Sequence, residues 1–132
     1  MHKQVNPESL EKPIGYAHGV LAKGNFLFIA GQVAHDKNGE MVSVGDIVGQ
    51  FRQAMTNFKA VLTEGGGKPE NLVKINIFTT DKNAYAKNGK EIGKIYRELF
   101  GKNFPAMTLC EVKSLFEDDY LLEIEGTAVI PD

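Results

Sequence analysis

The sequence predicts an α+β domain in which helices cover one face of a β-sheet. Two segments, beginning near Asp46 and near Glu91, carry apolar residues at helical spacing. Segments of alternating or continuous apolar character lie before, between and after them, which gives the order β-β-α-β-α-β-β. The chain has 132 residues and no internal repeat or linker, so we expect one domain over residues 1–132.

The N-terminal part predicts a polar arm followed by a β-hairpin. Residues up to Lys12 are polar, and a first strand is expected over 16–22. The turn-like residues 23–25 separate it from a continuous apolar strand over 26–30, so we expect these two strands to pair. Gly31 follows directly, at a point where a glycine allows the backbone to approach another group closely.

The longest helix is predicted after Asp46, whose side chain can cap its first turn. Its apolar face consists of Val48, Phe51, Met55, Phe58 and Leu62. Its opposite, polar face consists of Gln50, Gln53, Asn57 and Lys59. The three glycines at 65–67 end the helix.

A strand over 72–78, a polar loop over 81–88 and a second helix over 91–100 follow, and Gly101 stops that helix. The cluster of glycines at 65–67 is no phosphate-binding loop, because it follows a helix instead of preceding one.

Two strands with alternating faces end the chain, over 107–112 and 120–130. Glu123 and Glu125 share one face of the last strand, with their Cα atoms roughly 6.5 Å apart. Glu123 lies among apolar neighbours, where a carboxylate can exchange protons near neutral pH. An acid–base pair and a pair of solvated carboxylates both fit this spacing. Leu109 and Leu121 are expected on the sheet face away from the helices, which indicates burial by a partner subunit.

Composition argues against several classes of function. The formal net charge is −2 and the lysines are scattered, so nucleic-acid binding is not favoured. We expect a soluble, cytoplasmic protein, because no apolar signal region or membrane-spanning run is present.

Metal and thiol chemistry are not favoured either. His2, His18 and His35 lack the spacing of metal ligands, and no cofactor is expected. Cys110 is the only cysteine and has no activating residue near it in sequence, so we expect a small buried side chain.

The C-terminal strands carry a recognisable pattern. Residues 104–112 read Phe-Pro-Ala-Met-Thr-Leu-Cys-Glu-Val, and residues 122–129 read Leu-Glu-Ile-Glu-Gly-Thr-Ala-Val. This block resembles the C-terminal signature of the RidA/YjgF family, the reactive-intermediate deaminases, also known as endoribonuclease L-PSP. Further matching segments cover nearly the whole chain and include residues 15–16, 28–32, 50–57, 73–81 and 96–100.

The resemblance implies a chorismate-mutase-like fold and a homotrimer with a central β-barrel. It also implies small-molecule sites in the clefts between subunits. Three residues match positions of the family site, namely Tyr16, Gly31 and Glu123. Glu123 corresponds to the glutamate thought to position the water that attacks an imine.

Three positions of the implied site differ from the deaminating members. Met107 stands where they have the arginine that holds a substrate carboxylate. Gly93 replaces an asparagine, and Leu109 replaces a cysteine. The resemblance therefore implies a poor 2-iminopropionate deaminase, unless Arg97 of a neighbouring subunit replaces the arginine.

The sequence leaves more than one function open. The first is a hydrolase or deaminase of another imine, enamine or related C–N substrate, with Glu123 as the base. The second is a non-catalytic small-molecule-binding or regulatory module that uses the same cleft. An endoribonuclease is less favoured, because a His/Lys/Arg constellation for phosphodiester chemistry is absent from the sequence.

Overall fold

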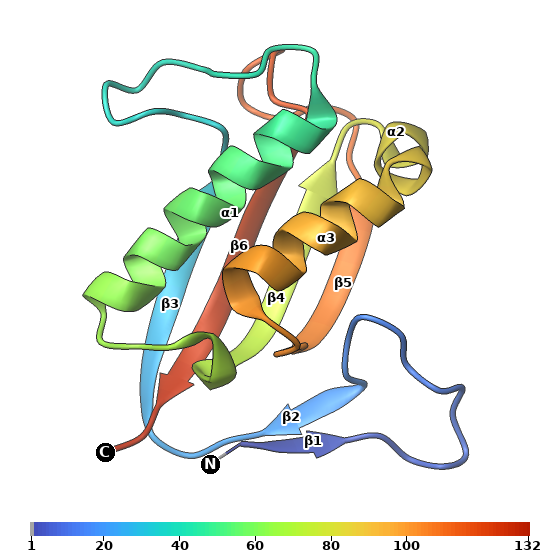
Figure 1. Cartoon of the computed structure of the whole chain (residues 1–132), viewed down its shortest axis with the longest axis vertical. Helices are drawn as coiled ribbons and strands as arrows, with labels where there is room; N and C mark the ends of the chain where they lie inside the picture. The colour runs from blue at the N-terminus through green and yellow to red at the C-terminus, as the bar shows by residue number, and fades with distance from the viewer. Residues whose placement is uncertain (1) are drawn as a thin grey trace.

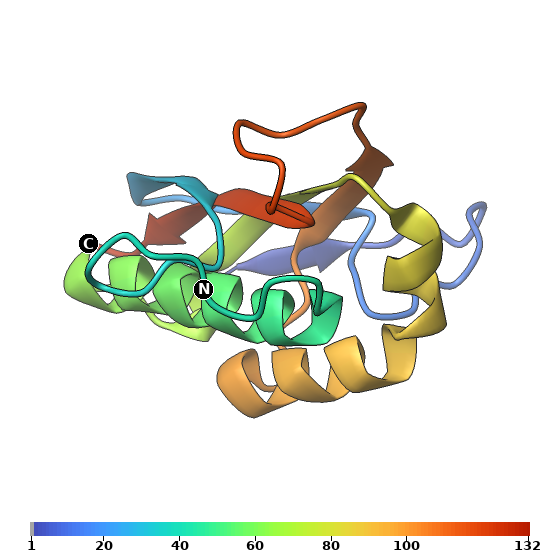
Figure 2. The same ribbon diagram turned by 90° about the horizontal axis from the view of Figure 1, so that it is seen from above.

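The computed structural model describes residues 2–132 and shows a β-sheet with helices packed on one face (Figures 1 and 2). The elements, in chain order, are β1 (Lys3–Val5), β2 (Gly19–Leu21), β3 (Asn25–Gln32), α1 (Ile47–Glu64), the 3₁₀ turn η1 (Pro69–Asn71), β4 (Leu72–Thr79), α2 (Lys82–Lys87), α3 (Gly89–Phe100), β5 (Ala106–Glu111) and β6 (Leu122–Ile130).

The main sheet has four strands in the order β3-β6-β4-β5. β6 is antiparallel to both β3 and β4, whereas β4 and β5 are parallel. β1 and β2 form a separate antiparallel pair beside it. In Figure 2 both α1 and α3 lie on one side of the main sheet, so its other face carries no helix. This confirms the predicted α+β class.

The core lies between the main sheet and the two long helices. Phe58 of α1 and Phe100 of α3 meet edge to face, with ring centroids 6.1 Å apart. On β6 the buried residues Leu122, Ile124, Gly126 and Ala128 alternate with half-exposed ones, and Val129 near the end of the strand is buried as well. A Cβ at Gly126 would lie 2.8 Å from Cζ of the Phe58 ring, so this glycine lets α1 pack close to the sheet. The alternation predicted for the last strand is therefore confirmed.

The first helix begins and ends close to where the sequence predicts. The Asp46 carboxylate accepts a hydrogen bond of 3.1 Å from the Gly49 amide, which caps the helix. Helix α1 ends at Glu64, and Gly66 then adopts a φ of 87°, a conformation that favours glycine.

The predicted N-terminal hairpin is wrong. β2 covers only Gly19–Leu21 and pairs with β1. β1 itself lies inside the segment expected to be a polar arm without a strand. β3 pairs instead with β6, from Asn25 opposite Ile130 to Ile29 opposite Gly126. The long apolar β6 gives β3 a partner along most of its length, whereas the short β2 does not.

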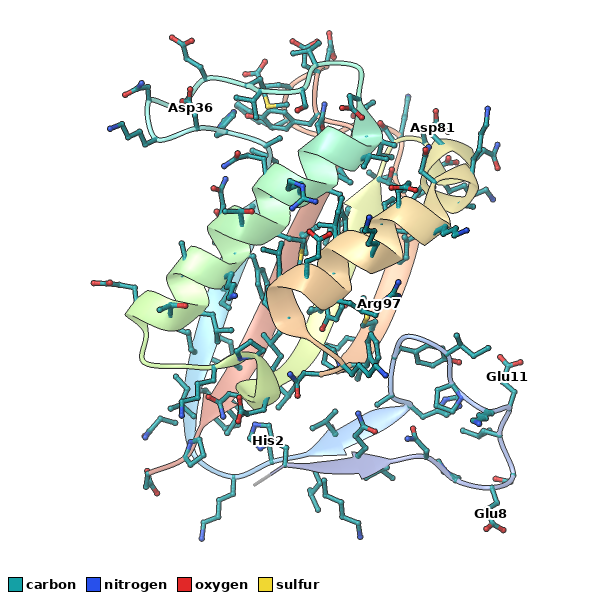
Figure 3. The ribbon with its side chains drawn as sticks, viewed as in Figure 1. His2, Glu8, Glu11, Asp36, Asp81 and Arg97 are labelled. Carbon is teal, nitrogen blue, oxygen red and sulfur yellow. The ribbon has the colours of Figure 1, made fainter. Side chains whose placement is uncertain are left out.

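The predicted loop at 81–88 contains the short helix α2, which is also a correction. The Asp81 carboxylate accepts a hydrogen bond of 3.0 Å from the Ala84 amide and so caps α2 (Figure 3). None of its residues is fully buried, so the apolar periodicity that reveals a helix is absent.

The prediction that Leu109 and Leu121 lie on the sheet face away from the helices is also wrong. Leu109 pairs with the buried Ile77, which puts its side chain on the helix side of the sheet, and Leu121 packs against the core. The face away from the helices carries Phe26 and Phe28 instead, which are 62% and 74% exposed.

Cys110 lies on this same face and is exposed, contrary to the expected buried side chain. Cys110 and Thr108 share a face, as the alternation predicts, but within residues 2–132 no helix covers that face.

No helix among residues 2–132 combines the length and hydrophobicity that are needed to cross a membrane.

Candidate functional site

Glu123 lies near the start of β6 on the open face of the sheet, where it is half-buried and pairs with Phe78 of β4. The neighbouring β3 contains a bulge beside it. Ile29 pairs with Gly126 and Gln32 pairs with Ile124, so Ala30 and Gly31 both lie opposite Glu125, two positions from Glu123 along β6. Bulges of this kind often re-aim a side chain at a functional site.

Gly31 and Glu123 are in close contact, whereas the sequence predicts only that the backbone at Gly31 approaches some group closely. A Cβ added at Gly31 would overlap the Glu123 carboxylate, at 2.8 Å from its Cδ carbon. Only a residue without a side chain therefore leaves room for this carboxylate above the bulge.

The two glutamates of β6 differ in their partners. Glu125 accepts a hydrogen bond of 3.2 Å from the Asn76 side chain on β4. Among the described residues, none donates a hydrogen bond to the Glu123 carboxylate. Its oxygens are therefore the ones left available to a water molecule or a ligand.

Sequence reasoning missed a hydrogen-bonded pair beside Glu123. The buried Tyr120 hydroxyl and His35 Nε2 are 3.0 Å apart, and their rings meet edge to face. Burial raises the pKa of Tyr120, and the carboxylates of Glu117 and Glu123 raise it further. His35 and Tyr120 are 85 positions apart, and no motif in the sequence links them.

Three of the other predicted site residues meet at the β5 edge of the sheet. Tyr16, Met107 and Leu109 line a hollow of about 360 Å³ there. The other lining residues are Ile14, Gly15, Ile77, Tyr85 and Thr108. These residues are mostly apolar, and none of them is a lysine or an arginine.

The backbone explains how this hollow forms. The Ala17 amide donates a hydrogen bond of 2.9 Å to the Pro105 carbonyl, and Ala17 forms a parallel bridge with Ala106. This contact ties the segment that bears Tyr16 to the start of β5. On the other side Tyr85 of α2 is largely buried, which raises its pKa to about 12.

Gly93 does not join the hollow. It lies on α3, and a Cβ at this position would be 3.2 Å from Nη1 of Arg97. Arg97 is exposed and projects from α3 on the side of β5 (Figure 3), and it does not line the hollow either.

One chain does not bring the two groups of site residues together. The side chains of Met107 and Leu109 pair with Ile75 and Ile77 on the helix side of the sheet. Glu123 projects from the open side, from a strand that β4 separates from β5. The site residues thus form two separate half-sites, the Glu123 half-site (Gly31 and Glu123) and the hollow.

The described histidines do not converge. His2 Nε2 contacts the Asn71 carbonyl at 3.0 Å, and His18 Nε2 contacts the Glu11 carbonyl at 2.8 Å. Within residues 2–132, no three His, Cys, Asp or Glu side chains are grouped as metal ligands would be.

The comparisons with known proteins agree with this fold. The family model described as endoribonuclease L-PSP matches residues 7–130. A RutC family protein of Pyrococcus horikoshii is 40% identical over 129 residues, which cover 97% of this chain and 98% of that protein. A protein of Dermatophagoides farinae named 2-iminobutanoate/2-iminopropanoate deaminase is 33% identical, over 90% of this chain and 89% of that one.

Among solved structures, the Yersinia pestis protein YyfB, a Rid-family member of unknown function, superposes with a TM-score of 0.87. It is 32% identical, and the match covers 98% of each chain. Sheet order, helix placement and sequence similarity thus agree on a single class, that of small α+β proteins of the Rid type. The chain belongs to the RidA/YjgF family.

Proposed function

We propose that this protein is a hydrolase that deaminates an imine or enamine, with Glu123 as the base that activates water. One observation carries the proposal: the Glu123 carboxylate lies over the Gly31 bulge, and no other described residue donates a hydrogen bond to it. A half-buried carboxylate with free oxygens is suited to hold a water molecule and to accept its proton.

The proposed reaction is the hydrolysis of a protonated imine. Glu123 takes a proton from water while the water oxygen bonds to the imine carbon and the C=N π electrons move to nitrogen. The protonated carboxyl then returns this proton to the nitrogen of the carbinolamine. As the C–N bond breaks, its electron pair leaves with the nitrogen as ammonia and the hydroxyl becomes a carbonyl. Glu123 takes the hydroxyl proton and passes it to the ammonia, so that ammonium and a ketone or aldehyde leave. An enamine enters the same sequence after it tautomerises to the imine.

The complete site, in this proposal, forms between subunits of a homotrimer. The Glu123 half-site and the hollow lie on opposite faces of the sheet, so one chain cannot present both to a small substrate. Association also explains the exposed Phe26 and Phe28 on the open face. Burying such rings against another chain stabilises the complex by roughly 25 cal/mol per Å² of apolar area.

The hollow favours a substrate whose bound end is apolar. A relative is named as a deaminase of 2-iminobutanoate and 2-iminopropanoate, both of which carry a carboxylate. Here Met107 lines the hollow and no lining residue is cationic. A carboxylate placed there would lose water and gain no partner, which is unfavourable. The proposed substrate is therefore an imine or enamine with an apolar substituent and no carboxylate. It is called the neutral imine below, although the form that reacts is protonated on nitrogen.

The same observation supports a second candidate function. A site without a cation to anchor an α-imino acid can also serve a non-catalytic module that binds a small apolar molecule. The endoribonuclease reading that the family description suggests is disfavoured by the net charge of −2, since RNA binding depends on contacts with phosphates.

A matched pair of substrates tests the proposal. A flavin amine oxidase converts 3-methylbutylamine into a neutral imine, and an amino-acid oxidase converts leucine into an imino acid with the same side chain. Decay of each imine is followed in competition with trapping by semicarbazide. The proposal predicts faster decay of the neutral imine with the wild-type protein, and loss of that acceleration in Glu123→Gln but not in Glu125→Gln. If the protein binds the neutral imine but does not accelerate its decay, the protein is the non-catalytic binding module and not a hydrolase.

A further inference from the structure

Two residues beside the Glu123 half-site have no role in the proposed reaction. His35 follows Gly31 by four positions, and Tyr120 precedes Glu123 by three. Their side chains share the 3.0 Å hydrogen bond, and Tyr120 is 7% exposed. This bond therefore joins the segment that leaves the bulge to the segment that enters β6.

The polar face of α1 fixes the backbone of both segments. The side chain of Gln50 is fully buried; it donates to the Asp119 carbonyl at 3.0 Å and accepts from the Leu121 amide at 2.9 Å. It thus holds the residues on either side of Tyr120. Buried polar groups that are satisfied in this way specify one backbone arrangement.

Asn57 performs the same task for the other segment. Its amide donates to the Val33 carbonyl at 3.1 Å and to the His35 carbonyl at 2.9 Å. Gln53 donates to the Asn57 side-chain oxygen at 2.9 Å and so orients it. The sequence predicts only a polar helix face here. In the structure, Gln50 and Asn57 bind by hydrogen bonds to the backbone of the two segments that carry His35 and Tyr120.

The pKa of the Tyr120 hydroxyl is affected by the negative charge of Glu123 in the half-site. Burial is the main reason that its pKa is raised, and the Glu117 and Glu123 carboxylates add to the effect. Tyr120 therefore stays protonated at neutral pH and keeps its hydrogen bond with His35.

We infer that Tyr120 and His35 form a pair of positioning residues that holds the Glu123 carboxylate over the Gly31 bulge. The inference rests on the proposed function, because it takes Glu123 to be the base. It goes beyond that function by assigning a task to two side chains that do not touch the substrate. The pair fixes the distance between β6 and the bulge at the point where β3 ends and β6 begins.

Turnover of the neutral imine tests this inference. Tyr120→Phe removes only the hydroxyl, and His35→Phe removes its partner. Each variant is expected to lower kcat on the order of tenfold, because one hydrogen bond is lost, while KM stays within about twofold. The double variant should lose no more than either single one. His35→Gln keeps a side-chain acceptor for the hydroxyl and should retain most of the turnover.

A matched control separates positioning from stability. Tyr96 is 5% exposed, and its hydroxyl donates to the Asn103 carbonyl, away from both half-sites. Tyr96→Phe should lower Tm about as much as Tyr120→Phe and leave kcat unchanged. In a Glu123→Gln background, Tyr120→Phe should lower Tm as before without a further loss of kcat. An equal loss of kcat in both backgrounds would overturn the inference.

A measurement that needs no substrate keeps this inference separate from the proposed function. The carboxyl ¹³C resonance of Glu123 is assigned by its absence in Glu123→Gln. It should shift at pH 7 in Tyr120→Phe and in His35→Phe, but not in Tyr96→Phe. If it stays in place, the pair does not position Glu123, whether or not any imine is hydrolysed. If it shifts while no imine is hydrolysed, only the proposed function fails.

Discussion

Replacing Met107 by arginine should turn this protein toward carboxylated imines. Met107 is half-buried in the hollow, beside Leu109 and Tyr16, and no lysine or arginine lines that hollow. A guanidinium offers two parallel donors that match both oxygens of a carboxylate, whereas a thioether is at most a weak acceptor.

The size of the effect follows from these two hydrogen bonds. Each charge-assisted bond contributes roughly 1.5–3 kcal/mol net. Together they contribute about 3–6 kcal/mol to transition-state binding, which is on the order of 10²–10⁴-fold in kcat/KM. Met107→Arg should therefore raise kcat/KM for the imino acid derived from leucine by up to this factor.

The neutral imine derived from 3-methylbutylamine serves as the internal reference, because it lacks only the carboxylate. Met107→Leu conserves volume and should leave the ratio of the two rates unchanged. The family resemblance implies an asparagine at position 93 in the deaminating members, so Met107→Arg with Gly93→Asn is measured alongside. A wild-type rate on the imino acid equal to that of an arginine-containing relative would refute the reasoning.

Four further predictions follow from the same structure. Glu123→Gln should lower kcat by roughly 10²–10⁴-fold, the usual contribution of a general base, whereas Glu125→Gln, which keeps an amide oxygen that can accept from Asn76, should keep most of the activity. Gly31→Ala should displace the Glu123 carboxylate and lower kcat by roughly 10²-fold, with little change in Tm; an unchanged kcat would disprove the close approach. Light scattering at micromolar concentration should show a homotrimer, and a monomer alone would exclude the intersubunit site. The pKa of Tyr85 is raised from 10.0 to about 12 by burial, so its stabilising effect is complete below pH 10 and is lost as pH rises to 12. Across that window wild type should lose roughly 2–3 kcal/mol more stability than Tyr85→Phe in urea unfolding curves.

The parts of the fold that periodicity describes were predictable. Helix α1 has an apolar stripe, a capping aspartate and terminal glycines, so Asp46 and Gly65 mark its ends in the sequence as they do in the structure. β6 alternates regularly, and Glu123 is consequently on the face that the alternation indicates.

Pairing and face were harder to predict, because they depend on contacts between distant segments. The turn at 23–25 suggests a local hairpin, but β3 gains more backbone hydrogen bonds along β6 than it could with the short β2. Leu109 alternates correctly, yet only its register opposite Ile77 reveals that it lies on the helix side. Local patterns carry no information about which strand lies alongside.

In the candidate site, too, local patterns were predictable and contacts between distant segments were not. Gly31 and Glu123 meet within the chain, and Tyr16, Met107 and Leu109 share the hollow. Gly93 is separate from both half-sites within the chain. The contact between His35 and Tyr120 could not be predicted, because it depends on hydrogen bonds from α1 side chains to the two loops that carry these residues.

Mixing two inactive variants tests most directly whether the site is shared between subunits. Glu123→Gln keeps the hollow and lacks the base, whereas Leu109→Trp keeps the base and fills the hollow. The two proteins are unfolded together in equal amounts and refolded, and hydrolysis of the neutral imine is measured. If each site combines Glu123 of one chain with the hollow of its neighbour, random assembly leaves about one quarter of all sites complete, and activity should recover to about that fraction of the wild-type level. Activity no higher than that of the two separate variants would contradict a shared site.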